Sequence, residues 1–181
     1  MADDLRLLQR AKALDEAALA EIHERYYTSI YQYLAFRIND LQTVEDLTSE
    51  VFLRLLRAIR DKNAPQNTLR GWLYGVASHV VKEHYRKMKR MNFAPLEDEL
   101  MSNDERVEDQ IQNKLVWEAI RSVLGELTEE QQHVLALRFG FGMRVREIAQ
   151  RLDKSEGSVK MLQVRAISTL TQKLQPGGTG I

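Results

Sequence analysis

The chain has 181 residues, of which 44% are hydrophobic and 29% charged, and this balance is typical of a folded globular protein. It contains no cysteine, which excludes a disulfide framework, a thiol nucleophile and the usual cysteine-based zinc sites. The charged N-terminal stretch is not a secretory signal, and no apolar run approaches the roughly 18 residues of a membrane span. We therefore expect a cytoplasmic protein without membrane contact.

In the first part of the chain, apolar residues recur at steps of three and four, which predicts helices rather than strands. One apolar stripe runs over 19–33, and Asp15 precedes it in the position of an N-cap. A second stripe runs over 44–59, and Thr43 is the expected start of its helix.

A turn and a linker divide the chain. Pro65 and the asparagines beside it predict a turn, after which a third helix starts near Thr68 and ends in a basic cluster. These helices make up a first domain, residues 1–90. Residues 91–107 contain Pro95, lack an apolar stripe and are rich in acids, so we expect a flexible, hydrated linker there.

Apolar periodicity resumes over 108–175, which we assign to a second domain followed by a flexible tail, residues 176–181. A capping box at Thr128–Gln131 predicts the start of a helix that ends near the two glycines of "FGFG". Two short helices follow, at about 144–152 and 155–174. The predicted fold is all-α, with two small helical domains joined by an acidic flexible linker, and the C-terminal domain is a helix-turn-helix.

The formal net charge of zero hides two basic regions that flank the acidic linker. One of them is 138–174, which holds eight bases and three acids. In a helix-turn-helix the second helix lies in the DNA major groove, where lysine and arginine reach phosphates or guanine edges and apolar side chains pack on thymine methyls. The residues expected to point outward are Glu156, Ser158, Lys160, Met161, Val164 and Arg165. The alternative is a bundle hairpin with basic, solvent-facing residues.

The other basic region interleaves bases with aromatic residues, in "NTLRGWLYGVASHVVKEHYRKMKR". This combination suits unpaired nucleic acid, because unstacked bases can lie against aromatic rings. Trp72 has the spacing of a core residue, and we expect it to be buried. The contact candidates are Lys82, Arg86, Lys87, Lys89 and Arg90.

The chain resembles the extracytoplasmic-function (ECF) sigma factors of bacterial RNA polymerase along nearly its whole length. "VEDLTSEVFLRLLRAI" is similar to the stretch that docks on the polymerase β′ clamp helices, and "LRGWLYGVASHVVKEHYRKMKR" is similar to the element that recognises and melts the promoter −10 region. "LTEEQQHVLALRF" and "VREIAQRLDKSEGSVKMLQVRA" resemble region 4, which binds the −35 element. The resemblance implies a sigma factor that binds core polymerase through the β′ clamp helices and the β flap.

The resemblance also implies roles for individual residues. Polymerase binding is expected of Asp46, Glu50, Phe52 and Arg54. Contacts to the −10 element are expected of Asn63, Gln66, Asn67, His79, Lys82, Arg86, Lys87 and Arg90. Contacts to the −35 element are expected of Ser158, Lys160, Met161, Val164 and Arg165. The chain departs from the family pattern at Ser49, His79, Glu83, Asp153, Met161 and Leu162.

The resemblance further implies promoter DNA and an anti-sigma factor as partners, and a place on the nucleoid when the factor is part of the holoenzyme. An alternative is a helix-turn-helix transcription regulator that acts without polymerase, and another is a structural adaptor. Catalysis is not expected, because His79 and His84 are badly spaced for one helix face and no metalloprotease, phosphate-loop or catalytic-triad motif is present. No metal or cofactor is predicted, and His23 and His133 are expected at the surface or its boundary.

Overall fold

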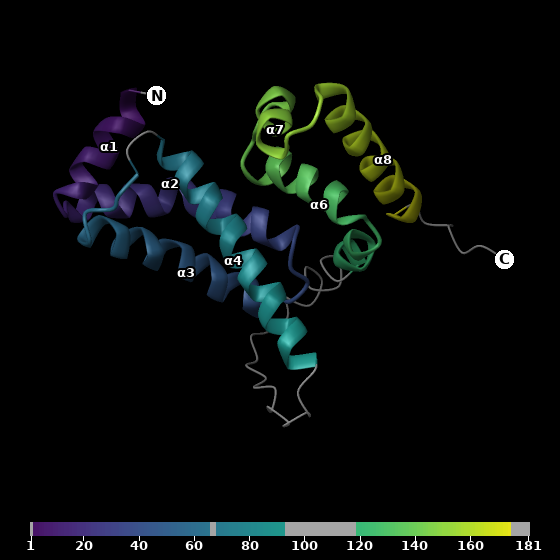
Figure 1. Ribbon diagram of the computed structural model, residues 1–181, viewed down its shortest axis with the longest axis horizontal. Helices are drawn as coiled ribbons and strands as arrows, with labels where there is room; N and C mark the ends of the chain where they lie inside the picture. The colour runs from purple at the N-terminus through teal and green to yellow at the C-terminus, as the bar shows by residue number, and fades with distance from the viewer. Residues whose placement is uncertain (1, 66–67, 93–118, 175–181) are drawn as a thin grey trace, which may run out of the picture.

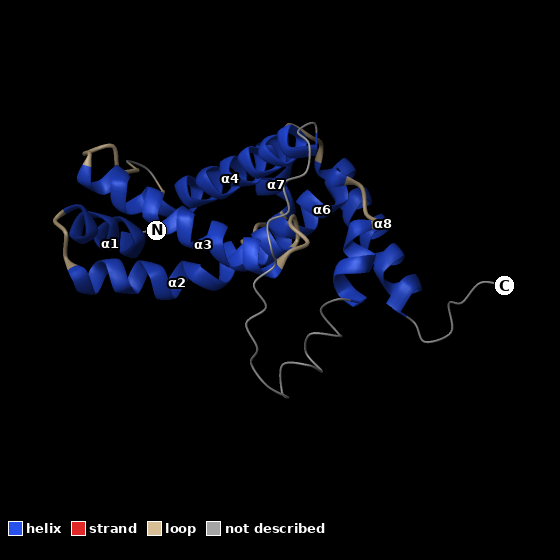
Figure 2. Cartoon of the chain, turned by 90° about the horizontal axis from the view of Figure 1, so that it is seen from below, coloured by secondary structure: helices blue, strands red, loops and turns tan. Residues whose placement is uncertain are grey.

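The computed structural model describes residues 2–65, 68–92 and 119–174, and every regular element within these ranges is helical (Figures 1 and 2). The prediction of an all-α fold is therefore confirmed. The helices are α1 (Ala2–Lys12), α2 (Glu16–Ala35), α3 (Leu41–Arg60), α4 (Leu69–Asn92), α6 (Glu129–Leu135), the π-helical turn η1 (Ala136–Gly140), α7 (Val145–Leu152) and α8 (Glu156–Leu174). Residues 119–125 are also helical.

Helices α1 to α4 form what we call the N-terminal bundle, and its helix starts test the predicted caps. Asp15 caps α2 as predicted, because its carboxylate accepts from the backbone N–H groups of Ala17 and Ala18. The predicted start of α3 is wrong. Asp40 is the cap, and its carboxylate accepts from both the backbone N–H and the hydroxyl of Thr43, at 2.8 and 2.6 Å. An ionised carboxylate is the stronger acceptor at the positive end of a helix, so the helix begins earlier.

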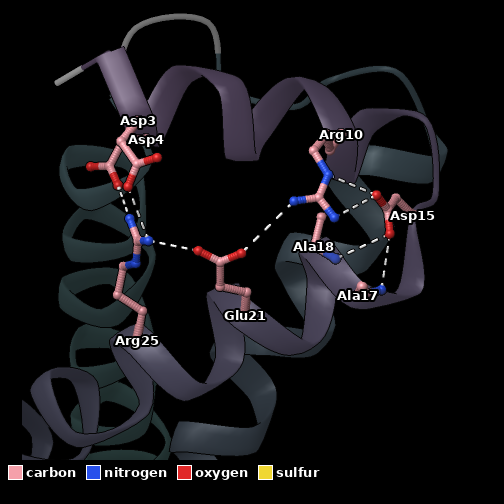
Figure 3. Close-up of polar contacts among 8 residues, drawn as sticks. All are labelled: Asp3, Asp4, Arg10, Asp15, Ala17, Ala18, Glu21 and Arg25. Atoms are coloured by element: carbon pink, nitrogen blue, oxygen red, sulfur yellow. Dashed lines mark hydrogen bonds and ion pairs between the residues drawn. The ribbon is translucent and has the colours of Figure 1, made fainter.

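Helix α1 is an element that the sequence analysis did not predict. It buries Leu7 and Leu8 against the bundle, and its acidic first turn is fixed to α2 by ion pairs. The guanidinium of Arg25 faces the neighbouring carboxylates of Asp3 and Asp4 (Figure 3), at 3.2 and 3.0 Å. The Arg25 side chain also meets a carboxylate oxygen of Glu21 at 2.6 Å.

The core of the N-terminal bundle is made by the apolar stripes of α2, α3 and α4. The predicted stripe residues Ile22, Val51 and Leu73 are fully buried. Thr48 is a buried polar residue, and its hydroxyl is satisfied because it donates to the carbonyl of Val44. Trp72 packs against this core but is only partly buried, so the prediction of a buried tryptophan holds in part.

Residues 119–174 form what we call the C-terminal bundle. The capping box at Thr128–Gln131 is present, with both reciprocal hydrogen bonds made. Helices α7 and α8 meet through the turn at Asp153, whose φ of 52° is left-handed and is tolerated by a short polar side chain. The Ser155 hydroxyl accepts from the backbone N–H of Ser158, as an N-cap does. The predicted helix-turn-helix is confirmed.

The two bundles pack directly on each other, with η1 against α2 (Figure 2). One hydrophobic cluster runs through both, and Tyr33 lies at its centre, fully buried, with its ring centroid 5.2 Å from that of Phe141. The approach is closest at Gly140, where a Cβ atom would lie 2.8 Å from the backbone nitrogen of Tyr33. Only glycine allows two backbones to come this close.

Part of the predicted linker is helical, because α4 continues to Asn92 and so extends two residues past the expected boundary at residue 90. The run of bases at the end of α4 has good helix formers, and no glycine or proline stops it before residue 95. The rest of the linker, the start of the second domain at 108–118 and the tail at 176–181 lie outside the described residues. The domain boundaries therefore stay a prediction.

Candidate nucleic-acid and polymerase interfaces

The outward face of α8 is free in this arrangement. Val159 and Ala166 point into the C-terminal bundle and are fully buried, whereas Met161 is 52% exposed and Val164 is 63% exposed. The predicted −35 residues are all exposed: Ser158, Lys160, Met161, Val164 and Arg165. An exposed apolar pair between two cations is unusual on a solvated helix, and it suits a groove that offers both thymine methyls and phosphates.

The basic side of α4 is exposed as well. Lys82, Arg86, Lys87 and Arg90 are exposed, and none forms an ion pair with another described residue. Of the predicted turn residues, Asn63 is exposed, while Gln66 and Asn67 lie outside the described residues. Unpaired cations along one helix provide the positive potential that a phosphate backbone requires.

Two of the atypical residues, His79 and Glu83, are joined to the predicted polymerase face by a chain of ion pairs. His79 lies 3.0 Å from Glu83, and Glu83 lies 2.6 Å from Arg54 on α3. Arg54 in turn meets Glu50 at 2.8 Å. The Arg54 guanidinium holds the pKa of Glu83 below its usual range. Arg54 and Glu50 are thus engaged within the bundle, and the pair between Arg54 and Glu83 links α3 to α4.

The remaining polymerase candidates differ in burial. Asp46 is exposed, and Phe52 is partly buried, with its ring centroid 4.6 Å from that of His23. The sequence analysis missed two exposed apolar residues on α3, Leu53 and Leu56, which are 46% and 43% exposed. Their position outside the buried stripe of α3 is the feature of the sequence that could have predicted their exposure. Exposed leucines beside a polar face are typical of a protein-binding surface.

The contact between the bundles contains ionisable groups that the sequence analysis did not connect. His133 of α6 lies 3.3 Å from the hydroxyl of Tyr33 and 3.4 Å from that of Tyr74. Burial, with Arg37 and Lys82 nearby, lowers the pKa of His133 to about 3. Burial also raises the pKa of Tyr33 to about 12. His133 was expected at the surface or its boundary, and the structure shows a half-buried side chain in the contact between the two bundles.

Arginines from both bundles complete this contact. The Arg151 guanidinium of α7 lies over the Tyr74 ring of α4, 4.6 Å from the centroid, in cation–π geometry. Arg70 of α4 donates to the backbone carbonyl of Phe141. The helix-turn-helix is therefore held against α4 through α7 and η1, and α8 is left on the far side.

Lowering the pH from 7 to 5 is expected to destabilise the folded chain by about 2 kcal/mol through His133. The unfolded chain binds this proton with the ordinary histidine pKa near 6.5. Because the folded pKa is about 3, stability that is present above pH 6.5 is lost as the pH falls from 6.5 towards 3. Urea unfolding at the two pH values measures the difference.

The control for this pH effect is a pair of substitutions. His133→Gln should remove most of the pH dependence, whereas His79→Gln, on the exposed side of α4, should keep it. His84 adds a contribution of the same sign, because burial lowers its pKa too, and it is present in both variants. An unchanged slope in His133→Gln would show that this histidine is not buried in solution.

Comparison with known proteins identifies the class. The sigma-70 region 2 model matches residues 22–91, and the sigma-70 region 4 model matches residues 123–172. The first segment includes α3 and most of α2 and α4, and the second includes α6, α7 and most of α8. Helices α4 and α8 carry the two basic surfaces. The chain is therefore a member of the sigma-70 family of transcription-initiation factors, and this family is not catalytic.

Its relatives place it within the family. The chain is 32% identical over 173 residues to the ECF RNA polymerase sigma factor BldN of Streptomyces coelicolor, an alignment that covers 94% of this chain and 65% of BldN. It is 27% identical over 164 residues to the ECF sigma factor SigX of Bacillus subtilis, covering 85% of this chain and 82% of SigX. The chain belongs to the ECF sigma factors, and a regulator acting without polymerase is not favoured.

A solved structure supports the fold. The structure of CnrH in complex with the cytosolic domain of CnrY matches with a TM-score of 0.66 at 21% identity, covering 93% of this chain and 94% of CnrH. Among the helices within residues 2–65, 68–92 and 119–174, none is long and apolar enough to cross a membrane.

Proposed function

We propose that this protein binds core RNA polymerase through the β′ clamp helices and the β flap, and directs it to promoters by contacting their −35 and −10 elements. The observation that carries the proposal is the free outward face of α8, where exposed cations flank the apolar pair Met161 and Val164. Sigma-factor membership supports the polymerase half of the proposal.

On this proposal, α8 reads the −35 element in the major groove through Ser158, Lys160, Met161, Val164 and Arg165. The −10 element contacts α4 and the turn before it. The residues assigned to this contact are Asn63, Gln66, Asn67, His79, Lys82, Arg86, Lys87 and Arg90. Unpaired cations of α4 attract the phosphates of the melted strand. The two strands separate because the protein binds unstacked bases, and these are accessible only when they have left the duplex.

Polymerase docking is assigned to the exposed side of α3. Asp46 and Phe52 are the accessible members of the predicted set, and we add Leu53 and Leu56, whose exposure suits an apolar contact with a helical partner. Glu50 and Arg54 support this surface from beneath through their ion pairs. We further propose an anti-sigma factor partner and a cytoplasmic, nucleoid-associated location, on the family resemblance.

Adding the purified protein to core polymerase is expected to give transcripts from a restricted set of promoters, because selectivity comes from two DNA-reading surfaces on one factor. Mapping of transcript start sites with the reconstituted holoenzyme measures this. Core polymerase alone is the control. A folded protein that yields no promoter-specific transcript would contradict the proposal, and tight binding of duplex DNA without polymerase would favour a repressor or activator.

A further inference from the structure

A cavity of about 540 Å³ lies where α2, α4 and α6 meet, and its walls are strongly cationic. Helix α4 contributes Lys82, Arg86 and Lys89, at steps of four and three that place them on one side of the helix. The turn after α2 contributes Arg37, and the carboxylate in the lining is that of Glu129 on α6. Four cations around one carboxylate give the cavity a potential that attracts anions.

Arg37 is the unusual member of this group. Its side chain is only 6% exposed, and its Nε has no hydrogen-bond partner among the described residues. The ion pair that Arg37 makes with Glu129 is long, 3.4 Å from Nη2 to a carboxylate oxygen, and the Glu129 side chain is 86% exposed. A buried guanidinium with an unused donor is costly unless a ligand satisfies it.

The position of Arg37 is fixed by its neighbours. The Tyr85 hydroxyl of α4 donates to the backbone carbonyl of Arg37, which ties the end of α2 to α4. The neighbouring Ile38 is buried in the core. The guanidinium is therefore held at the cavity wall by the fold rather than by a strong ion pair, and this is the condition for a preorganised binding site.

We propose that this cavity binds a phosphate group, with Arg37 as the central donor and Lys82 and Arg86 neutralising the charge. A guanidinium matches phosphate with paired hydrogen bonds, and lysine adds a compact positive charge. The phosphate comes either from a free phosphate compound or from a nucleic-acid strand. Since α6 forms one wall and α2 and α4 the others, the bound group contacts both bundles and stabilises their packing by mass action.

The test is calorimetric titration of the full chain, at constant ionic strength, with inorganic pyrophosphate and separately with a short single-stranded DNA oligonucleotide. Saturable binding of pyrophosphate identifies a free phosphate as a ligand, and binding of the oligonucleotide alone identifies a nucleic-acid phosphate. The double variant Lys82→Gln/Arg86→Gln should weaken binding roughly tenfold or more. Arg37→Gln should do the same, with circular dichroism confirming that it folds.

Matched controls separate a built site from general positive charge. Lys87→Gln/Arg90→Gln removes the same charges from the same helix, but neither residue lines the cavity, so the affinity for pyrophosphate should stay within about twofold. Glu129→Gln should tighten binding, because it removes the carboxylate that opposes the anion. Glu130→Gln, whose carboxylate pairs with Lys154 at 2.6 Å, should leave binding unchanged.

Two outcomes would overturn the phosphate site: no saturable binding of either probe, or an equal loss of pyrophosphate affinity in the two double variants. The phosphate site shares Lys82 and Arg86 with the proposed −10 surface, but its test is separate, because the titration contains no polymerase and no promoter. Equally, a failure to support transcription would leave a positive titration intact.

Discussion

Gly140→Ala is expected to destabilise the folded chain by about 2–3 kcal/mol and to weaken the packing of η1 on α2. The added Cβ would lie 2.8 Å from the backbone nitrogen and 2.9 Å from the Cα of Tyr33. Backbone atoms in the last turn of α2 cannot move aside as a flexible side chain can, so the two bundles must separate locally. Urea unfolding followed by circular dichroism measures the change in the free energy of unfolding.

Gly75→Ala is the matched control for this prediction. Gly75 lies within α4, and a Cβ atom there would meet nothing within 4 Å. Alanine is the better helix former by about 1 kcal/mol, so this substitution should leave the stability unchanged or raise it. If Gly140→Ala proved as stable as the wild type, the close contact between η1 and α2 would not exist in solution.

Lys160→Ala and Arg165→Ala are both expected to weaken −35 binding, and they should do so in different ways. An arginine that is bidentate to guanine contributes about 1–3 kcal/mol, so Arg165→Ala should lower transcription from a −35-dependent promoter roughly tenfold or more and relax selectivity at that base. A lysine on a phosphate weakens binding to all sequences alike and lowers the salt dependence by about one charge. Transcription at graded salt concentrations distinguishes the two.

Lys173→Ala serves as the control, since it removes a cation from the last turn of the same helix. Its ammonium pairs with Glu126 at 2.9 Å, away from the proposed recognition residues. All three side chains are exposed, so stability should change by no more than about 0.5 kcal/mol in any variant. Normal transcription by both Lys160→Ala and Arg165→Ala would mean that the recognition surface lies elsewhere.

Local features of the fold could be predicted because their causes are local. Asp15, Thr128 and Ser155 each cap a helix by hydrogen bonds that span two or three residues, so the sequence around them is sufficient. The start of α3 shows the limit of this reasoning. Asp40 and Thr43 both have capping side chains, and the choice depends on which acceptor the folded backbone reaches.

The candidate site was predictable to a similar extent. Helical period alone placed Val159 inward and Lys160, Val164 and Arg165 outward, and these predictions are confirmed. The pairing of Arg54 with Glu83 could not be predicted, because the two residues lie on different helices and 29 positions apart. Which of the polymerase candidates are accessible depends on that packing.

By itself, the amino-acid sequence determined that this protein is helical, where most of its helices begin and end, and which side of α8 is exposed, since each follows from periodicity and from contacts within a turn or two. Only the tertiary structure decided that the bundles share one core, that Tyr33 meets His133 across 100 positions, and that Arg37 is buried beside a cationic cavity. The physical reason is that burial and pKa depend on neighbours brought together by packing. The spacing of residues along the chain does not encode which distant residues become neighbours.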